Sequence, residues 1–148
     1  MNQASGVDTA ARRRSRRVII QLLYQWHLTQ DSVSTLVEQF LPELEAKSAD
    51  KDYFDRVVVE MFPLISALDE KLSGYLSRDT NELSLGRKAV FRLGAVELDH
   101  CVDVPYQAVI NEAVELNKRY GTKEGHRFEN GVLDKFAQES RATEFKSK

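Results

Sequence analysis

The spacing of the apolar residues limits the fold of this chain more than any other feature, because it follows the period of an α-helix. Val18, Ile19, Leu22, Leu23 and Trp26 recur as the apolar stripe of one helix. Comparable stripes return along the rest of the sequence, and no run of four or more residues alternates cleanly as a strand between turn signals. The sequence therefore predicts an all-α protein with six to seven helices.

Residues with special backbone preferences predict where several of these helices begin, bend and end. Asp31 and Ser32 are expected to supply the cap of the second helix, because their side-chain oxygens can accept a hydrogen bond from a backbone amide. Pro63 falls inside the third apolar stripe and should kink or split that helix, since proline lacks a backbone donor. Asp103 and Pro105 mark the start of a later helix, and Gly121 marks its end.

Length and composition predict one soluble domain with short terminal tails. The chain has 148 residues, of which 42% are hydrophobic and 30% are charged, as in ordinary folded domains. We expect residues 1–10 to form a disordered tail, residues 11–140 a single helical domain, and residues 141–148 a flexible tail. No apolar run approaches the roughly 20 residues that span a bilayer, and no secretory signal is recognisable. The single Cys101 fits a reducing compartment, so a cytoplasmic protein without a membrane partner is predicted.

Five arginines are clustered within residues 12–17, directly before the first apolar stripe. Residues 1–17 carry these arginines and one carboxylate, a charge of +4, whereas residues 18–148 carry 16 basic and 22 acidic side chains, a charge of −6. Arginine offers a planar fork of donors that matches phosphate oxygens, and phosphate contacts release counterions. The cluster therefore favours a polyanion as ligand, and a solvated tail or a targeting segment is the alternative.

The sequence lacks the common motifs of catalysis. It has no glycine-rich phosphate loop, no nucleophile elbow and no zinc spacing of Cys and His pairs. The densest group of possible metal ligands is Glu97, Asp99, His100, Cys101 and Asp103. Neighbouring positions on a helix diverge by about 100°, which disfavours the convergence that a metal site requires. We predict no enzyme, no catalytic residue, no metal and no cofactor, and keep a metal-dependent helical hydrolase as an alternative.

Two places combine an aromatic residue with basic residues, which suits single-stranded nucleic acid. Tyr24 follows the arginines on the same predicted helix, beside its apolar stripe, where it either stacks on a base or forms the rim of the core. Arg127 and Phe128 stand at the start of the last predicted helix, where a ring and backbone amides can hold a nucleotide. A plain core position is the alternative for Phe128.

Several stretches of the sequence resemble the NusB family of bacterial transcription antitermination factors. They are, in order, Ala11–Arg16, Gln21–Trp26, Tyr75–Arg78, Lys88–Val90, Asp103–Tyr106, Val109–Leu116 and His126–Lys135. The similarity extends from about Ala11 to about Ala137, with the same order and spacing. It implies an all-helical fold of two small packed bundles and a role without catalysis.

The resemblance also implies a ligand and partners. Members of the family bind the boxA element of ribosomal-RNA leader transcripts as a heterodimer with NusE, a protein of the small ribosomal subunit. This assembly loads onto RNA polymerase, which then reads through terminators. The residues implied in RNA contact are Arg12, Arg13, Arg14, Arg16, Tyr24, Arg127 and Phe128.

The surface for the protein partner is implied around Tyr75, Glu82 and Arg87. Here the sequence departs from the family, because Gly86 and Arg87 stand where an acidic residue is common. Two alternatives stay open at this point. The free protein can be a monomer or a homodimer, and the chain can be a protein-interaction scaffold without specific RNA binding.

Overall fold

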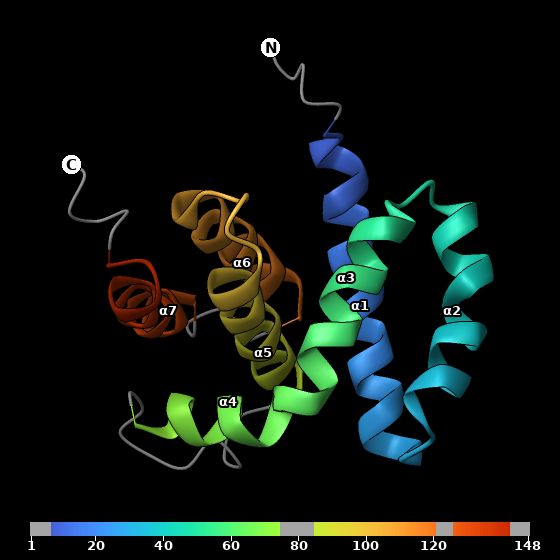
Figure 1. Ribbon diagram of the computed structural model, residues 1–148, viewed down its shortest axis with the longest axis horizontal. Coiled ribbons are helices and arrows are strands. Elements are labelled where there is room, and N and C mark those ends of the chain that lie inside the picture. Colours follow the sequence, from blue (N-terminus) through green and yellow to red (C-terminus); the bar gives the residue numbers. More distant parts are fainter. Residues whose placement is uncertain (1–6, 75–84, 121–125, 143–148) are drawn as a thin grey trace. The chain divides into compact units, whose positions relative to one another are not determined.

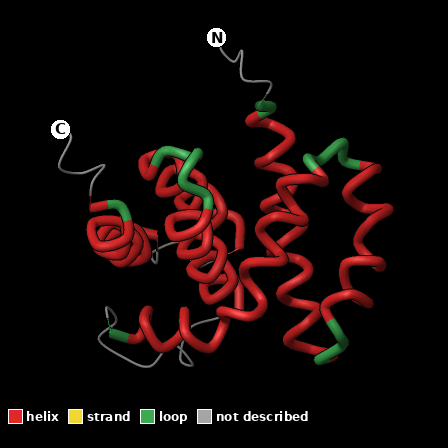
Figure 2. Tube along the Cα trace, viewed as in Figure 1, coloured by secondary structure: helices red, strands yellow, loops and turns green. Residues whose placement is uncertain are grey.

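The computed structural model describes residues 7–74, 85–120 and 126–142, and for residues 126–130 it describes the backbone alone. All regular structure in these ranges is helical (Figures 1 and 2). The elements are α1 (Thr9–Thr29), α2 (Val33–Ala46), α3 (Lys51–Met61), the 3-10 turn η1 (Phe62–Leu64), α4 (Ile65–Ser73), α5 (Leu85–His100), α6 (Tyr106–Tyr120) and α7 (His126–Ser140). The all-α prediction is confirmed, and no helix in the described ranges is long and apolar enough to cross a bilayer.

The chain divides into two compact units, Met1–Val58 and Val59–Lys148. In the first unit α1 packs against α2, and residues 30–32 reverse the chain between them (Figure 1). The core of this unit is apolar and contains Val18, Ile19, Leu22, Leu36 and Phe54. Burial of such side chains supplies most of the free energy that holds short helices together.

The second unit is arranged around α5, which is buried along nearly its whole length. Almost every side chain of residues 86–98 is enclosed, and α5 packs against α4, α6 and α7. A Cβ atom at Gly94 would lie 3.1 Å from Leu133 of α7, so this glycine lets the two helices approach closely. Arg92 of α5 forms a bidentate ion pair with Asp69 of α4 at 2.9 and 3.0 Å, which satisfies a largely enclosed charge.

Several predicted helix boundaries are confirmed. The Ser32 hydroxyl accepts a hydrogen bond from the amide of Thr35 at 3.3 Å and caps α2. Pro63 lies in η1 and separates α3 from α4, as expected of a residue that cannot continue the backbone ladder. Helix α6 ends at Tyr120, immediately before Gly121.

The first helix begins earlier than the sequence suggested. Helix α1 starts at Thr9, inside the segment expected to be a disordered tail. The carboxylate of Asp8 accepts a hydrogen bond from the amide of Ala11 at 3.0 Å and caps the helix. A carboxylate at this position satisfies a backbone donor and favours the positive end of the helix dipole, which extends α1 by about one turn.

The end of the described chain is fastened to α5. Arg141, which the sequence placed in a flexible tail, is 6% exposed. Its guanidinium donates hydrogen bonds to the backbone carbonyls of Glu97, Leu98, Cys101 and Val104. These carbonyls belong to the last turn of α5 and the loop after it, where helical hydrogen bonds run out; those of Glu97 and Cys101 also accept from the backbone amides of Cys101 and Val104. Arg141, which follows α7 in the sequence, therefore caps the C-terminal end of the buried helix α5.

Candidate nucleic-acid interface

The arginine cluster forms part of α1 and does not precede it as a separate arm. Its side chains differ in exposure because successive residues on a helix point in different directions. Arg13 is exposed, Arg12, Arg14 and Arg17 are half-buried, and Arg16 is 4% exposed. The cluster is therefore a set of cations with different environments.

Tyr53 of α3 is the aromatic centre of this region. The guanidinium carbons of Arg12, Arg16 and Arg56 lie 4.4, 5.3 and 5.0 Å from the centroid of its ring. Tyr53 itself is 2% exposed, and its amide donates to the carboxylate of Asp50 at 2.9 Å. A cation against an aromatic face gains about 0.5–2 kcal/mol. The ring thus offsets part of the repulsion between guanidinium groups that stand close together.

The loop between α2 and α3 holds the same region from the other side. Arg14 donates to the carbonyl of Ser48 from two nitrogens at 3.0 and 3.3 Å. The guanidinium of Arg12 lies 3.8 Å from the carboxylate of Asp50. The Ser15 hydroxyl donates to the carbonyl of Asp50 at 2.7 Å. Three arginines of the cluster therefore have directed contacts to α3 or to its preceding loop, which fixes where their charges lie.

This arrangement is suited to an extended polyanion. Contacts within the protein hold the arginine stems, so the side chains lose less conformational freedom when they meet a phosphate. Arg13 is exposed on α1, and the neighbouring arginines add positive potential there. Arg16, in contrast, is enclosed in this structure and acts on the site through Tyr53.

Tyr24 lies further along α1 and is half-buried. Gln21 and Gln25, which flank it at helical spacing, are half-buried as well. Partial exposure is compatible with both readings of Tyr24, since a ring at the rim of a core also offers one edge or face to solvent. The structure thus places Tyr24 on the same helix as the arginines, at the boundary between core and surface.

The other predicted site residues belong to the second unit or lie outside the described residues. Arg127 and Phe128 are placed in the first turn of α7 by the backbone, and their side chains lie outside the description. Tyr75 and Glu82 also lie outside the described residues. Arg87 is 9% exposed, because α5 is enclosed along almost its whole length.

The group of possible metal ligands does not converge in the part of the chain that the structure describes. No three His, Cys, Asp or Glu side chains there are placed to hold one ion. His100 is exposed, and its Nδ1 lies 3.5 Å from the carboxylate of Glu60. Cys101 and Glu97 are enclosed at 1% exposure each. The helical geometry thus separates these side chains, as their spacing suggested.

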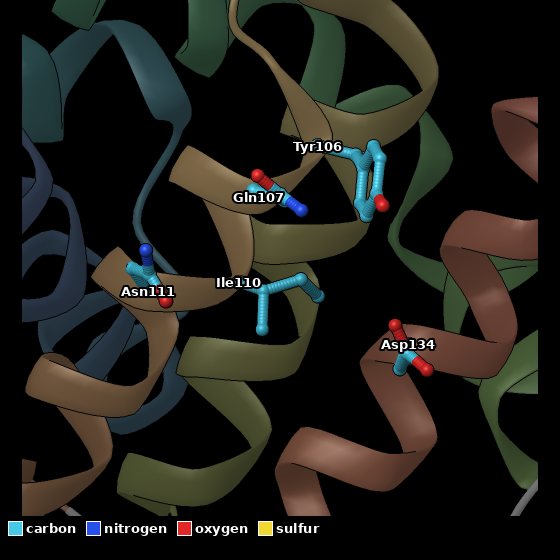
Figure 3. Close-up of a pocket in the computed structure, with 5 residues that line it drawn as sticks. All are labelled: Tyr106, Gln107, Ile110, Asn111 and Asp134. Atoms are coloured by element: carbon cyan, nitrogen blue, oxygen red, sulfur yellow. The ribbon is translucent and has the colours of Figure 1, made fainter. Parts of the chain in front are cut away.

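A small pocket between α6 and α7 was missed at the level of sequence. It has a volume of about 270 Å³, and the described residues that line it are Tyr106, Gln107, Ile110, Asn111 and Asp134 (Figure 3). The first four lie on successive turns of α6, and Asp134 faces them from α7. Their helical spacing was visible in the sequence, but the pairing of α6 with α7 depends on tertiary packing.

Comparison with known proteins assigns a family to these features. The model of the NusB family matches residues 13–138. Proteins named transcription antitermination protein NusB are similar over most of their length. The relative from Idiomarina loihiensis is 46% identical over 134 residues, which cover 90% of this chain and 96% of the relative. The relative from Tolumonas auensis is 42% identical over 130 residues, which cover 88% and 94%.

Solved structures show the same fold. NusB from T. maritima superimposes with a TM-score of 0.80 at 31% identity, over 91% of this chain and 96% of that chain. A crystal structure of the antitermination factors NusB and NusE in complex with dsRNA contains a chain that matches with a TM-score of 0.76. That chain is 23% identical, and the match covers 89% of this chain and 99% of that one. The likeness in this second case concerns the fold.

Proposed function

Because this chain belongs to the NusB family of transcription antitermination proteins, we propose that it binds boxA-type single-stranded RNA in nascent ribosomal-RNA transcripts. It does so together with NusE, and the assembly helps RNA polymerase to read through terminators. The family consists of transcription factors and not of enzymes. The observation that carries the proposal is the arginine cluster of α1, which contacts within the protein hold in place at Tyr53 and at residues 48–50.

The physical basis of RNA affinity is the concentration of positive charge at one end of α1. Each phosphate that meets an arginine releases condensed counterions, so affinity falls as salt rises. Arg13 and Arg14 would make the most direct contacts, while Arg12 and Arg16 add positive potential from beside Tyr53. The relative solved with NusE and dsRNA supports a nucleic acid as the ligand of the family.

Sequence preference requires groups that contact bases. Single-stranded RNA is read by stacking on aromatic rings and by hydrogen bonds to base edges, each worth about 1–3 kcal/mol. We assign stacking to Tyr24 on α1 and to Phe128 at the start of α7, where Arg127 adds a phosphate contact. Tyr24 belongs to the first unit and Phe128 to the second, and each ring would add its own contribution to RNA affinity.

NusE is the proposed protein partner, and electrostatics favours it. Residues 18–148 carry a net charge of −6, which suits a basic ribosomal protein. Tyr75, Glu82 and Arg87 remain the proposed contacts. A partner that extends the RNA-binding surface would raise RNA affinity, and by linkage RNA would raise partner affinity by the same factor.

A binding titration tests this function. Fluorescently labelled boxA-type RNA and a scrambled RNA of equal composition would be titrated at two salt concentrations, with and without NusE. We expect tighter binding of the boxA-type strand, a further gain with NusE and a loss at high salt. Equal and weak binding of both strands, unaffected by NusE, would favour the interaction-scaffold alternative and overturn the proposal.

A further inference from the structure

The pocket between α6 and α7, here called the α6–α7 pocket, is lined mainly by polar side chains. Two carboxamides, Gln107 and Asn111, come from α6, and the carboxylate of Asp134 comes from α7 (Figure 3). Ile110 and Tyr106 add apolar surface between them. Gln107 and Asn111 are exposed and Asp134 is half-buried, so the polar groups are reachable from solvent.

The chemistry of this lining distinguishes between classes of ligand. A carboxamide offers a donor and an acceptor side by side, whereas a carboxylate offers acceptors only. A lysine or arginine side chain of another protein presents donors alone, and would use only the acceptors of this lining. The edge of a nucleobase presents donors and acceptors next to each other, and Asn, Gln and Asp are among the side chains that pair with such edges. The mixture of groups therefore fits a base better than a cation.

The size of the pocket agrees with a fragment of that kind. Sites for whole drug-sized ligands usually measure about 300–1,000 Å³. The α6–α7 pocket, at about 270 Å³, lies below that range and suits one planar ring with its exocyclic groups. The side chain of Ile110, between the polar groups in Figure 3, provides an apolar surface for such a ring.

Helix α7 connects the α6–α7 pocket with the proposed RNA contacts at its start. Positions 127, 131, 134 and 138 recur at intervals of four, three and four residues, so they share one face of α7. Arg127 stands at the first of these positions and Asp134 at the third. A strand that meets the first turn of α7 can therefore follow one helix face to the pocket.

Gly131 occupies the position between them and gives an independent indication. Glycine inside a helix is unfavourable relative to alanine. At Gly94 close packing explains the glycine, because a Cβ atom would press against Leu133 at 3.1 Å. Among the described residues, a Cβ atom at Gly131 would meet nothing within 4 Å, and the residue is exposed. Packing against these residues does not explain the glycine, whereas a ligand that passes over the helix would.

We propose that the α6–α7 pocket binds one nucleobase of the RNA strand and contributes to sequence discrimination. Asn111 and Gln107 pair with the base edge, and the Asp134 carboxylate accepts from an exocyclic amino group or a ring N–H. Guanine, adenine and cytosine offer an exocyclic amino group to this carboxylate, and uracil offers its ring N3–H. This inference rests on the proposed RNA-binding function and adds a specificity-determining site to it.

The test compares two variants of the full chain, Asn111→Ala and Asp134→Asn. Two quantities are measured for each variant. The first is the ratio of the Kd for scrambled RNA to the Kd for boxA-type RNA, and the second is the slope of log Kd against log salt. Because base contacts set preference and phosphate contacts set the salt slope, we expect each variant to lower the ratio about tenfold. The salt slope should stay at the wild-type value.

Glu115→Gln is the matched control. Glu115 is exposed on α6 and does not line the pocket; its carboxylate pairs with Lys118 at 3.2 Å, and the change removes one negative charge, as Asp134→Asn does. If Asp134 only repels RNA through its charge, both changes will tighten binding of both RNAs equally, which overturns the proposal. Asn111→Ala carries no charge change and faces solvent, so circular dichroism should show an unaltered helix content.

Gly131→Ala tests the path along α7. The substitution should raise the melting temperature of the protein through helix propensity. It should nevertheless weaken the binding of boxA-type RNA about threefold. Unaltered RNA affinity in this more stable variant, together with an unaltered ratio in Asn111→Ala and Asp134→Asn, would contradict the inference. If those variants instead weaken NusE binding in the absence of RNA, the pocket seats a partner side chain and the proposal is also wrong.

Failure of this inference is distinguishable from failure of the proposed function. A wild-type chain that shows no preference for boxA-type RNA contradicts the function itself. A wild-type chain with the preference, and pocket variants that keep it, contradicts only the assignment of the α6–α7 pocket.

Discussion

Arg16 in the first unit and Arg141 in the second are almost equally enclosed, at 4% and 6% exposure, but their surroundings differ. Arg16 belongs to a cluster of cations, and its guanidinium lies 5.3 Å from the ring centroid of Tyr53. Arg141 is surrounded by the backbone carbonyls at the end of α5, to which it donates hydrogen bonds. The first arginine helps to concentrate charge near the surface, and the second closes the end of a buried helix.

The difference shows how one residue type serves two purposes. Clustered guanidinium groups repel one another, so the cluster on α1 opposes folding slightly and is relieved when an anion binds. Tyr53 and Asp50 reduce that cost without neutralising the charge. Arg141 faces acceptors whose loss of partners would be costly in the interior. Stability should therefore depend most on the second region, and RNA affinity on the first.

The largest effect is expected from Arg141→Ala. The change removes the hydrogen bonds from Arg141 to the carbonyls of Glu97, Leu98, Cys101 and Val104 and opens a cavity beside α5; Glu97 and Cys101 keep backbone donors. We expect the free energy of unfolding to fall by roughly 3 kcal/mol, measured by urea denaturation. Arg141→Lys should recover only part of it, because an ammonium group lacks the fork geometry. Full stability in the alanine variant would remove the distinction between the two arginines.

Tyr53→Leu is expected to affect both stability and RNA binding. Loss of the buried ring should cost about 2 kcal/mol of unfolding free energy and release Arg12 and Arg16 from their stacked positions. RNA affinity should fall several-fold in fluorescence titrations. Tyr53→Phe keeps the ring and should keep the affinity.

Phe54→Leu is the control for that experiment. Phe54 is fully buried on the same helix, so its truncation should destabilise the unit by a similar amount. Equal RNA affinities for the two leucine variants, both measured where they are folded, would show that Tyr53 serves packing alone.

Gly131→Ala should raise the stability of the protein, whereas the preceding variants lower it. The residue is exposed in the middle of α7, and a Cβ atom there meets nothing within 4 Å in the part of the chain that the structure describes. Alanine in place of glycine is expected to stabilise the helix by about 1 kcal/mol, seen as a higher midpoint in thermal unfolding. Gly94→Ala is the contrasting variant, because its Cβ would press against Leu133 at 3.1 Å. A gain of stability in both glycine variants would show that neither position is constrained by packing.

Local signals in the sequence were sufficient for the helices. Ser32 and Pro63 predicted a start and a break correctly, because capping and the missing proline donor act within a few residues. The start of α1 came out too late, since Asp8 was not recognised as its cap. Arg141 was assigned to a tail because its partners lie about 40 positions earlier in the chain, a separation at which local patterns carry no information.

The candidate site was only partly accessible from the sequence for the same reason. The cluster of arginines is local and was recognised directly. Its division into exposed and enclosed side chains depends on Tyr53 and Ser48, which approach α1 through tertiary packing. Asp134 and Asn111 lie in different helices and meet only once α6 and α7 are paired. Residue type alone predicted neither the contacts of Tyr53 and Ser48 with α1 nor the pairing of α6 with α7.

Arg13→Ala should change stability least and test the role of the first region most directly. Arg13 is exposed on α1, so the free energy of unfolding should change by less than about 0.5 kcal/mol. RNA affinity should fall, and the slope of log Kd against log salt should decrease by about 0.7 if one phosphate contact is lost from a single strand. Arg119 is also exposed and lies at the end of α6, so Arg119→Ala removes the same charge and should leave the slope unchanged.

Equal slopes for the two variants would mean that the cluster acts only through the net charge of the protein. A smaller slope for Arg13→Ala alone would place a phosphate at the exposed side of α1, where the contacts to Tyr53 and Ser48 concentrate the positive charge.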